Sequence, residues 1–316
     1  MKFEELQGLS ERLLSEVSTV IVGKRATLEF VLTAFLANGH ILFEDFPGLA
    51  KTLMSKLFAQ ALGCRFRRIQ FTPDLLPADI TGTYVLDRRD GQFKLRHGPI
   101  FANILLADEI NRAPPKTQSA LLEAMQERQV TIEGDTYPLE RPFIVIATQN
   151  PIEYEGTYPL PEAQIDRFMM RLSVGYPTKE EEVQILTRRV EFQTDDYRVD
   201  PVMNPEIFLE AQRVTEQVHV DDSIKEYAVE IVQKTRTHSL IGLGSSPRGS
   251  LAIMHLSRAR AALVGRDFVV PEDVKAVAVP ALSHRLLLKS GTWLAGTKSE
   301  EIVRAILDET KAPRPS

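Results

Sequence analysis

The spacing of apolar side chains separates a mixed first part of the chain from a helical second part. In the first part, recurrence every three or four residues predicts helices over 3–20, 26–37, 53–62 and 118–128. Continuously apolar or bounded short runs predict strands over 41–43, 67–71, 104–107 and 143–148. Continuously apolar strands are typical of sheets covered on both faces, so we expect a buried parallel sheet.

Two β-hairpins interrupt this pattern, over 82–97 and 129–139. In each, two strand-like runs meet at a short segment that contains glycine. Arg88 and Arg89 at the tip of the first hairpin, together with Arg96, would form a local basic surface. His97 is interpreted as structural, because glycine and proline follow it and no other ligand type lies at metal-binding spacing.

The second part begins after Tyr176-Pro177-Thr178, where a run of acidic residues is typical of a helix start. From there the pattern is almost wholly helical, most clearly over 205–214, 222–237, 250–264 and 300–310. Strands mixed with helices, followed by helices alone, predict two domains. We expect an α/β domain over 1–178 and an all-α domain over 179–316.

Composition narrows the class of protein. The chain of 316 residues is 43% hydrophobic and 26% charged, as soluble globular proteins are. Its net charge of −5 and pI of about 5.8 argue against a basic field that binds nucleic acid. The single cysteine, Cys64, excludes an intramolecular disulfide and fits a reducing compartment. Because residues 1–5 are charged and no apolar run spans a bilayer, we expect a cytoplasmic protein without membrane insertion.

The segment 45–52 resembles the phosphate-binding pattern G-x-x-x-x-G-K-[ST]. It lies between a predicted strand and a predicted helix, where free backbone amides and the helix dipole favour an anion. Lys51 would bridge the β- and γ-phosphates of ATP or hold the phosphates of ADP, and Thr52 would place its hydroxyl on Mg²⁺. The nucleotide-binding residues expected in this turn and helix start are Pro47, Gly48, Leu49, Ala50, Lys51, Thr52 and Leu53.

Two residues of this segment replace glycines of the pattern. Ala50 costs little if its φ is negative. Asp45 brings a carboxylate near a polyanion, and its effect on nucleotide affinity is left open. We expect its side chain to point away from the phosphates, because a carboxylate that faced them would be repelled.

A pair of acids supports the same chemistry. Asp108 and Glu109 end the apolar run 104–107, and carboxylates at strand ends lie where α/β sheets bind ligands. Asp108 would bind Mg²⁺, while Glu109 would orient the attacking water. The combined motifs predict a nucleoside-triphosphate hydrolase.

Four further segments indicate the family to which such a hydrolase would belong. They are Ala107–Ala113, Gln118–Glu127, Ala147–Pro151 and Pro161–Phe168, and they resemble the MoxR family of AAA+ ATPases. The resemblance covers nearly the whole chain. It implies an AAA+ P-loop core with β-hairpin inserts on the pore face, a helical lid, and a ring that is commonly a hexamer.

The resemblance also implies roles for individual residues. Asn150 matches the polar sensor that positions water and the γ-phosphate. Arg167 matches the arginine finger that reaches a neighbouring subunit's nucleotide. Arg248, in Ser246-Pro247-Arg248, matches the lid sensor that touches the γ-phosphate of its own subunit. Val22 and Gly23 match the turn on the adenine side of the nucleotide.

The function implied is ATP-driven, chaperone-like remodelling of a protein client, often with a partner that carries a von Willebrand factor A domain. The client's assembly or metal-cofactor maturation would be the outcome. A metal-chelatase motor subunit, a nucleic-acid helicase or loader, and a non-hydrolysing scaffold are the alternatives. Stimulation of the ATPase by single-stranded DNA would distinguish the helicase class from the remodelling class.

Overall fold

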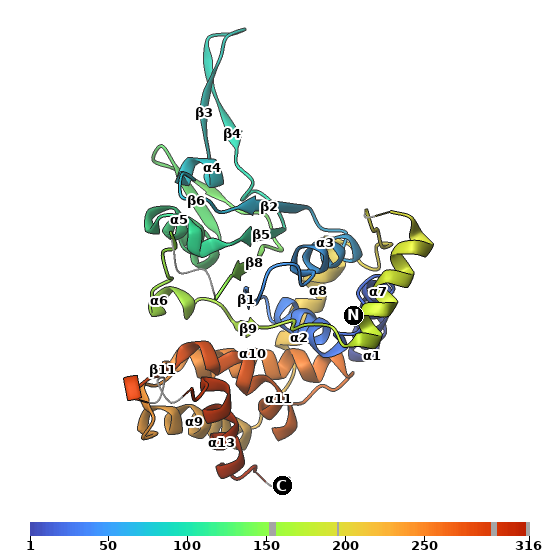
Figure 1. Cartoon of the computed structure of the whole chain (residues 1–316), viewed down its shortest axis with the longest axis vertical. Coiled ribbons are helices and arrows are strands. Elements are labelled where there is room, and N and C mark those ends of the chain that lie inside the picture. The colour runs from blue at the N-terminus through green and yellow to red at the C-terminus, as the bar shows by residue number, and fades with distance from the viewer. Residues whose placement is uncertain (152–155, 195, 292–295, 314–316) are drawn as a thin grey trace.

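Five parallel strands form the central sheet of this computed structural model, which describes residues 1–151, 156–194, 196–291 and 296–313. The strand order is β2-β5-β8-β1-β9, and every neighbouring pair is parallel. The strands are β1 (Ile41–Glu44), β2 (Phe66–Gln70), β5 (Ile104–Asp108), β8 (Ile144–Gln149) and β9 (Met170–Leu172). This confirms the predicted α/β core (Figure 1).

Alternate side chains of each central strand enter two separate hydrophobic clusters. Leu106 and Ile146 belong to one cluster, whereas Leu105 and Val145 belong to the other. The first face is covered by α1 (Phe3–Ser18), α2 (Arg25–Leu36) and α3 (Lys51–Ala61), and the second by α4 (Pro77–Thr81) and α5 (Pro115–Glu127). Burial on both faces explains why these strands read as continuously apolar.

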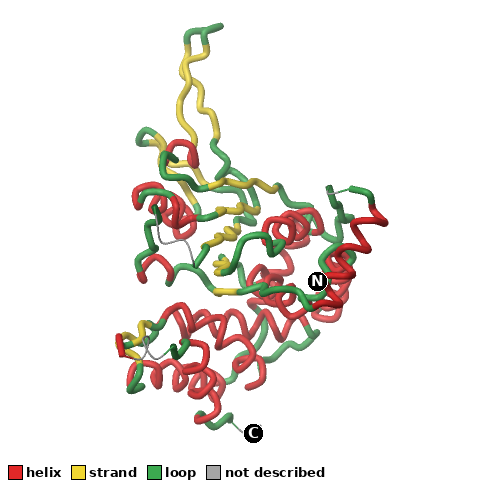
Figure 2. Tube along the Cα trace, in the orientation of Figure 1, coloured by secondary structure: helices red, strands yellow, loops and turns green. Residues whose placement is uncertain are grey.

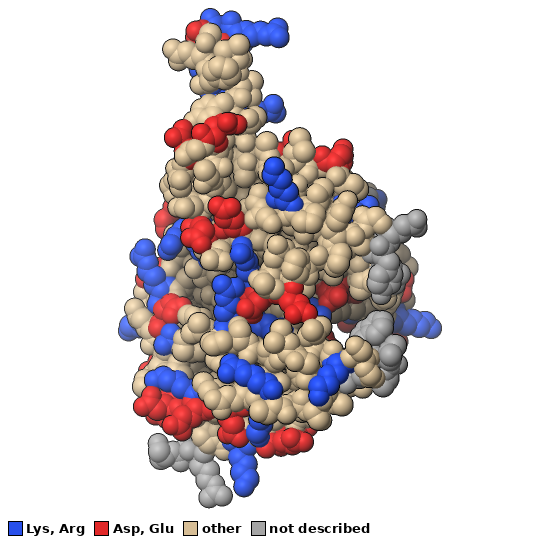
Figure 3. All heavy atoms as spheres, turned by 90° about the vertical axis from the view of Figure 1, so that its left-hand side faces the viewer, with Lys and Arg blue, Asp and Glu red and all other residues tan. Residues whose placement is uncertain are grey.

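Both predicted hairpins are confirmed and project from the second face. They are β3 (Gly82–Asp87) with β4 (Gln92–His97), and β6 (Gln129–Ile132) with β7 (Asp135–Pro138). The hydroxyls of Tyr84 and Tyr137 lie 2.5 Å apart and join the two hairpins. Figure 3 shows basic side chains at the tip of the long hairpin, where Arg88 and Arg89 are exposed, and interspersed acids and bases below it.

The remainder of the chain is mainly helical (Figure 2). Its helices are α6 (Glu162–Ile165), α7 (Lys179–Phe192), α8 (Pro205–Glu216), α9 (Asp222–Thr237), α10 (Pro247–Leu263), α11 (Pro271–Leu282) and α13 (Ser299–Glu309). Short 3₁₀ turns occupy Ile110–Arg112 and Ser283–Arg285. The first hydrophobic cluster continues from α1–α3 into these helices, and the boundary near residue 178 stays a prediction.

The second part is not purely helical as predicted. β10 (Ile241–Leu243) and β11 (Leu287–Leu288) form a two-stranded antiparallel sheet. Strands this short leave no periodic signal, since two or three residues do not establish an alternation. Their pairing joins the segments that follow α9 and α11, so it depends on helix packing and not on a local pattern.

Side-chain caps set where two of these helices begin. Thr178 accepts a hydrogen bond from the Glu181 amide, and Glu181 bonds back to the Thr178 amide, which confirms the predicted start of α7. Ser246 caps α10 through the Arg248 amide, with Pro247 in the first turn. α10 therefore begins three residues before the predicted start at Ser250 (247 against 250). None of the described helices is both long and apolar enough to span a bilayer.

His40 anchors the strand β1 to its surroundings. Its Nδ1 accepts from the Val145 amide at 2.9 Å, while its Nε2 lies 3.1 Å from the Met125 carbonyl oxygen, to which it donates. Burial, with a smaller contribution from the nearby Arg128, lowers the pKa of His40 to about 3. The folded protein therefore holds this imidazole neutral.

Acid should weaken the fold through His40. Its folded pKa lies below its unfolded pKa, so the unfolded chain binds more protons and stability falls as pH falls from about 6.5. Between pH 7 and pH 5 this residue should cost about 2 kcal/mol of unfolding free energy. Urea unfolding of the wild type and of His40→Gln measures the effect. Equal pH slopes in the two proteins would contradict it.

Candidate active site

The turn after β1 has the backbone shape of a phosphate-binding loop. Gly48 has φ 81° and Ala50 has φ 57°, so both residues are left-handed, and α3 begins at Lys51. Alanine in this conformation costs roughly 1–3 kcal/mol of folding free energy. The sequence pattern predicts a small cost only if the φ of Ala50 is negative, and this condition is not met. The turn directs the first amides of α3 outward, where they and the helix dipole favour an anion.

Lys51 is held over this turn by two hydrogen bonds to backbone carbonyl oxygens. Its Nζ donates to the carbonyl oxygens of Asp45 at 2.8 Å and Phe46 at 2.7 Å. Burial lowers the pKa of Lys51, while the charges of Asp45, Asp108 and Glu109 oppose that shift. A half-buried ammonium between a helix N-terminus and two strand-end acids is suited to a phosphate chain that carries Mg²⁺.

The carboxylate of Asp45 is buried and accepts four hydrogen bonds. Its Oδ2 accepts from Ser173 Oγ at 2.9 Å and from the amides of Val174 and Gly175 at 2.6 and 2.8 Å, and its Oδ1 accepts from the Phe46 amide at 2.9 Å. Ser173 directly follows β9, which neighbours β1 in the sheet. Asp45 therefore ties the phosphate-binding turn to the segment that follows β9.

A mostly apolar cavity of about 160 Å³ adjoins the turn. Four of the residues predicted to bind nucleotide line it, namely Gly48, Leu49, Ala50 and Leu53. Val22 also lines it, as do Val174 and Gly175, whose amides donate to Asp45. An apolar recess beside a phosphate-binding turn fits a nucleotide base.

Gly23 lies between Val22 and Lys24, which both line this cavity, in a left-handed conformation that favours glycine. Its φ is 63°, and a Cβ on it would lie 2.0 Å from Glu181 Oε1. The next residue, Lys24, donates to the Tyr176 carbonyl oxygen at 2.8 Å. Gly23 thus allows the entry of α2 to pack against α7 and close one side of the base cavity.

Two strand ends bring the predicted acids together beside Thr148. Thr148 Oγ1 donates to Asp108 Oδ1 at 2.5 Å and accepts from the Glu109 amide at 2.8 Å. Arg68 on β2 donates to Asp108 Oδ2 from Nη2 at 2.6 Å. The sequence interpretation missed Thr148 and Arg68, although Thr148 stands two residues before Asn150 in a segment that carried the family resemblance.

Glu109 occupies a left-handed position, φ 56°, which turns its side chain away from the strand direction. Its carboxylate accepts from Gln70 Nε2 at 2.6 Å and lies 3.2 Å from Arg112 Nε. Asn150 immediately follows β8 and is half-buried. Asp108, Glu109 and Asn150 therefore lie at the carboxyl ends of neighbouring strands, as predicted, where α/β sheets bind ligands.

The donor set suits Mg²⁺ bound together with phosphates. Thr52 in the first turn of α3 and Asp108 supply hard oxygen ligands, which Mg²⁺ prefers. Among the described residues no group of three or more histidine, cysteine, aspartate or glutamate residues could hold a metal by itself. The site fits a cation that takes its remaining ligands from phosphate and water.

The predicted arginine finger, Arg167, and the predicted lid sensor, Arg248, line one cavity that is separate from the base cavity. Arg167 and Arg248 both line a cavity of about 210 Å³ that contains none of the base-cavity residues. Arg248 Nε lies 3.9 Å from Asp166 Oδ2, and Arg167 Nη1 donates to the Leu122 carbonyl oxygen at 2.6 Å. The role of Arg248 at its own subunit's γ-phosphate stays a prediction, and in the structure Arg248 lines the same cavity as Arg167.

A buried arginine that the sequence did not reveal holds the Arg167 segment. Arg285, only 4% exposed, donates from Nε to Asp166 Oδ1 at 2.8 Å and from Nη2 to the Phe168 carbonyl oxygen at 2.7 Å. Ser246 Oγ donates to the other Asp166 oxygen at 3.2 Å. The residues on each side of Arg167 are thus fixed by the helical part of the chain.

Known proteins share this architecture from end to end. A model described as "ATPase family associated with various cellular activities (AAA)" matches residues 40–170, and an AAA lid domain model matches residues 233–306. Chaperone MoxR1 of Mycobacterium tuberculosis is 42% identical over 96% of this chain and 82% of its own length. The chain belongs to the MoxR family of AAA+ ATPases.

Two further comparisons agree with the MoxR family. The uncharacterized protein YeaC of Bacillus subtilis is 49% identical over 98% of this chain and 97% of its own. The crystal structure of a proposed ATPase from Cytophaga hutchinsonii superimposes with a TM-score of 0.92 at 40% identity, covering 99% of this chain and 97% of the other. The chain is accordingly a nucleotide-binding AAA+ ATPase with a chaperone-like role.

Lys51→Ala and Glu109→Gln should separate binding from turnover. Removing the ammonium leaves the phosphate charge uncompensated, so Lys51→Ala should abolish measurable ATP binding. Glu109→Gln keeps the phosphate contacts and should retain affinity while turnover stops. Titration calorimetry and a phosphate-release assay measure the two effects. An equal loss of affinity in both variants would refute this division.

Proposed function

We propose that this chain forms a hexameric ring in the cytoplasm. The ring would hydrolyse Mg-ATP to remodel a protein complex. A partner with a von Willebrand factor A domain would serve as client or adaptor. The work would be assembly of the partner complex or maturation of its metal cofactor. The partner, the outcome and the cellular location extend the family resemblance, whereas the ring is argued from the placement of the catalytic groups.

The observation that carries the proposal is the separation of the two halves of the site. The base cavity and phosphate-binding turn lie among α1, α3 and α7, whereas Arg167 lies beside α6, on the opposite flank of the core (Figure 1). A head-to-tail contact between copies would bring one flank against the other, and such a contact closes into a ring when the rotation allows. The separation therefore supports a site completed by a neighbour.

Arg248 follows the same logic. The guanidinium of Arg248 lines the same cavity as Arg167. It also forms an ion pair with the carboxylate of Asp166, the residue before Arg167. A contact that delivers Arg167 to the neighbour's phosphates would deliver Arg248 to the same place. We therefore assign both arginines to the neighbouring subunit's ATP, in place of the own-subunit role that the sequence suggested for Arg248.

The chain's own residues would then have separate roles in ATP hydrolysis. Lys51 neutralises phosphate charge, while the α3 amides hold the phosphate oxygens. Glu109 orients the attacking water after its carboxylate leaves Gln70 and Arg112, and Asn150 positions that water against the γ-phosphate. Arg167 and Arg248 stabilise the charge that develops there. Thr52 and Asp108 would hold Mg²⁺, which would supply positive charge to offset the negative charge of the phosphates.

Charge favours a protein client over nucleic acid. The net charge is −5, and the face in Figure 3 carries acidic side chains among the basic ones. Tracking a phosphate backbone requires a continuous basic surface, because each neutralised phosphate contributes to affinity. The surface charge therefore supports the remodelling class over the helicase class.

A trans role for Arg167 predicts complementation between inactive variants. Arg167→Ala should lower turnover roughly 10³–10⁵-fold, as loss of an arginine finger does, without loss of folding or nucleotide binding. Mixing it with Lys51→Ala subunits should restore part of the activity. Some interfaces then pair an intact phosphate site with an intact finger. Steady-state hydrolysis across mixing ratios measures this.

The matched control is Arg213→Ala, which removes an exposed arginine of α8. It should retain wild-type turnover alone and in mixtures. The trans assignment fails if the Arg167→Ala and Lys51→Ala mixture stays inactive while native mass spectrometry shows mixed assemblies.

A further inference from the structure

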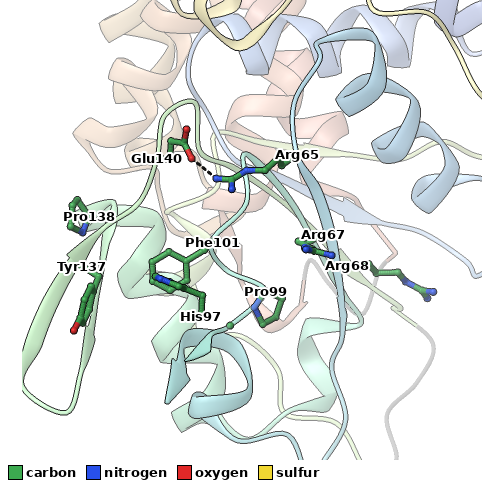
Figure 4. Close-up of a pocket in the computed structure, with 10 residues that line it drawn as sticks. Arg65, Arg67, Arg68, His97, Pro99, Phe101, Tyr137, Pro138 and Glu140 are labelled. Carbon is green, nitrogen blue, oxygen red and sulfur yellow. Dashed lines mark hydrogen bonds and ion pairs between the residues drawn. The ribbon is translucent and has the colours of Figure 1, made fainter. Parts of the chain in front are cut away.

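A cavity of about 750 Å³ lies outside the nucleotide site, along the outermost strand of the sheet. β2 forms one wall, the segment His97–Phe101 forms the floor, and the end of β7 forms the other wall. Figure 4 shows these side chains around the hollow. None of the base-cavity residues lines it.

The cavity wall is basic. Arg65 and Arg67 point to the same face of the strand, since side chains alternate along it. The single acid in the lining is Glu140, which is ion-paired with Arg65. Arg67 is exposed and has no acidic partner within 4.0 Å among the described residues. The lining therefore carries uncompensated positive charge.

β2 also offers backbone hydrogen bonds. It ends the strand order, so only β5 pairs with it among the described strands. The Ile104 amide donates to Arg65 O at 3.0 Å, and the Phe71 amide donates to Asp108 O at 2.8 Å, so the odd-numbered residues face β5. The amides and carbonyls of Phe66, Arg68 and Gln70 consequently face outward, as on any sheet edge.

The floor and far wall are aromatic. The rings of His97 and Phe101 meet edge to face with centroids 4.1 Å apart, and Tyr137 is half-buried beside them. These rings give an apolar surface opposite the arginines. A strand laid along β2 directs alternate side chains to this face, where acidic and apolar groups both find partners.

We propose that this cavity binds an extended acidic peptide segment of a protein partner, paired as an added strand with the outer edge of β2. Carboxylates of the peptide would contact Arg67 and Arg65, and its apolar side chains would lie over His97 and Phe101. A peptide fits better than a nucleic acid for two reasons. Only a peptide backbone matches the donors and acceptors of a strand edge, and the basic wall is a short recess. The cavity shares Arg68 with the candidate active site, since Arg68 also donates to Asp108, but none of the residues assigned to ATP hydrolysis lines it.

Binding can be measured without nucleotide. The probe is a short fluorescent peptide of alternating glutamate and valine, followed by anisotropy with the full chain. Arg67→Glu should weaken binding at least tenfold, which corresponds to a loss of about 1.4 kcal/mol of binding free energy. The matched control is Arg88→Glu, the same charge reversal at the exposed hairpin tip, which should change affinity less than about twofold.

Two further probes test the mode of binding. A peptide methylated on alternate backbone nitrogens, in the register that faces β2, should lose binding, because strand pairing needs those amides. A labelled single-stranded oligonucleotide should bind more weakly than the acidic peptide. The proposal is overturned if Arg67→Glu binds the peptide as the wild type does, if the methylated peptide binds unchanged, or if the oligonucleotide binds more tightly.

Discussion

One buried carboxylate connects the parts of the nucleotide site. Asp45 occupies the position of the first glycine in the pattern G-x-x-x-x-G-K-[ST]. Its four hydrogen bonds fix both the turn before α3 and the segment after β9. That second segment contributes Val174 and Gly175 to the base cavity. Asp45 is only 6% exposed, and a buried polar group is costly unless hydrogen-bond donors surround it, so the site depends on these four contacts together. The same carboxylate therefore links the phosphate turn to part of the lining of the base cavity.

A second set of contacts positions the segment around Arg167, on the opposite flank of the core. Arg285 and Ser246 come from the helical part and converge on Asp166, one residue before Arg167. The position of the finger therefore depends on the packing of helices that follow the core. If Arg167 acts on a neighbouring subunit as proposed, motion between the core and the helical part would change how far this arginine reaches.

Sequence reasoning predicted the parts of the site that are local in the chain. Lys51 and Asp108 follow from a strand, a turn and a charged residue in fixed order, and the predicted helix start after Thr178 carries a cap signal. It did not reveal contacts between distant segments. Asp45 meets Ser173, and Arg285 meets Asp166, through folding of the whole chain. The grouping of Arg248 with Arg167 and the pairing of β10 with β11 have the same cause.

The most direct measurement is titration calorimetry of a non-hydrolysable Mg-ATP analogue with the wild type, Asp45→Asn and Asp45→Gly. If Asp45 organises the site, restoring the glycine of the common pattern should weaken affinity by about tenfold or more, since the links to Ser173, Val174 and Gly175 are lost. Asp45→Asn should lie between, because an amide keeps one acceptor. Equal or tighter binding by a folded Asp45→Gly would contradict the anchoring role of this carboxylate.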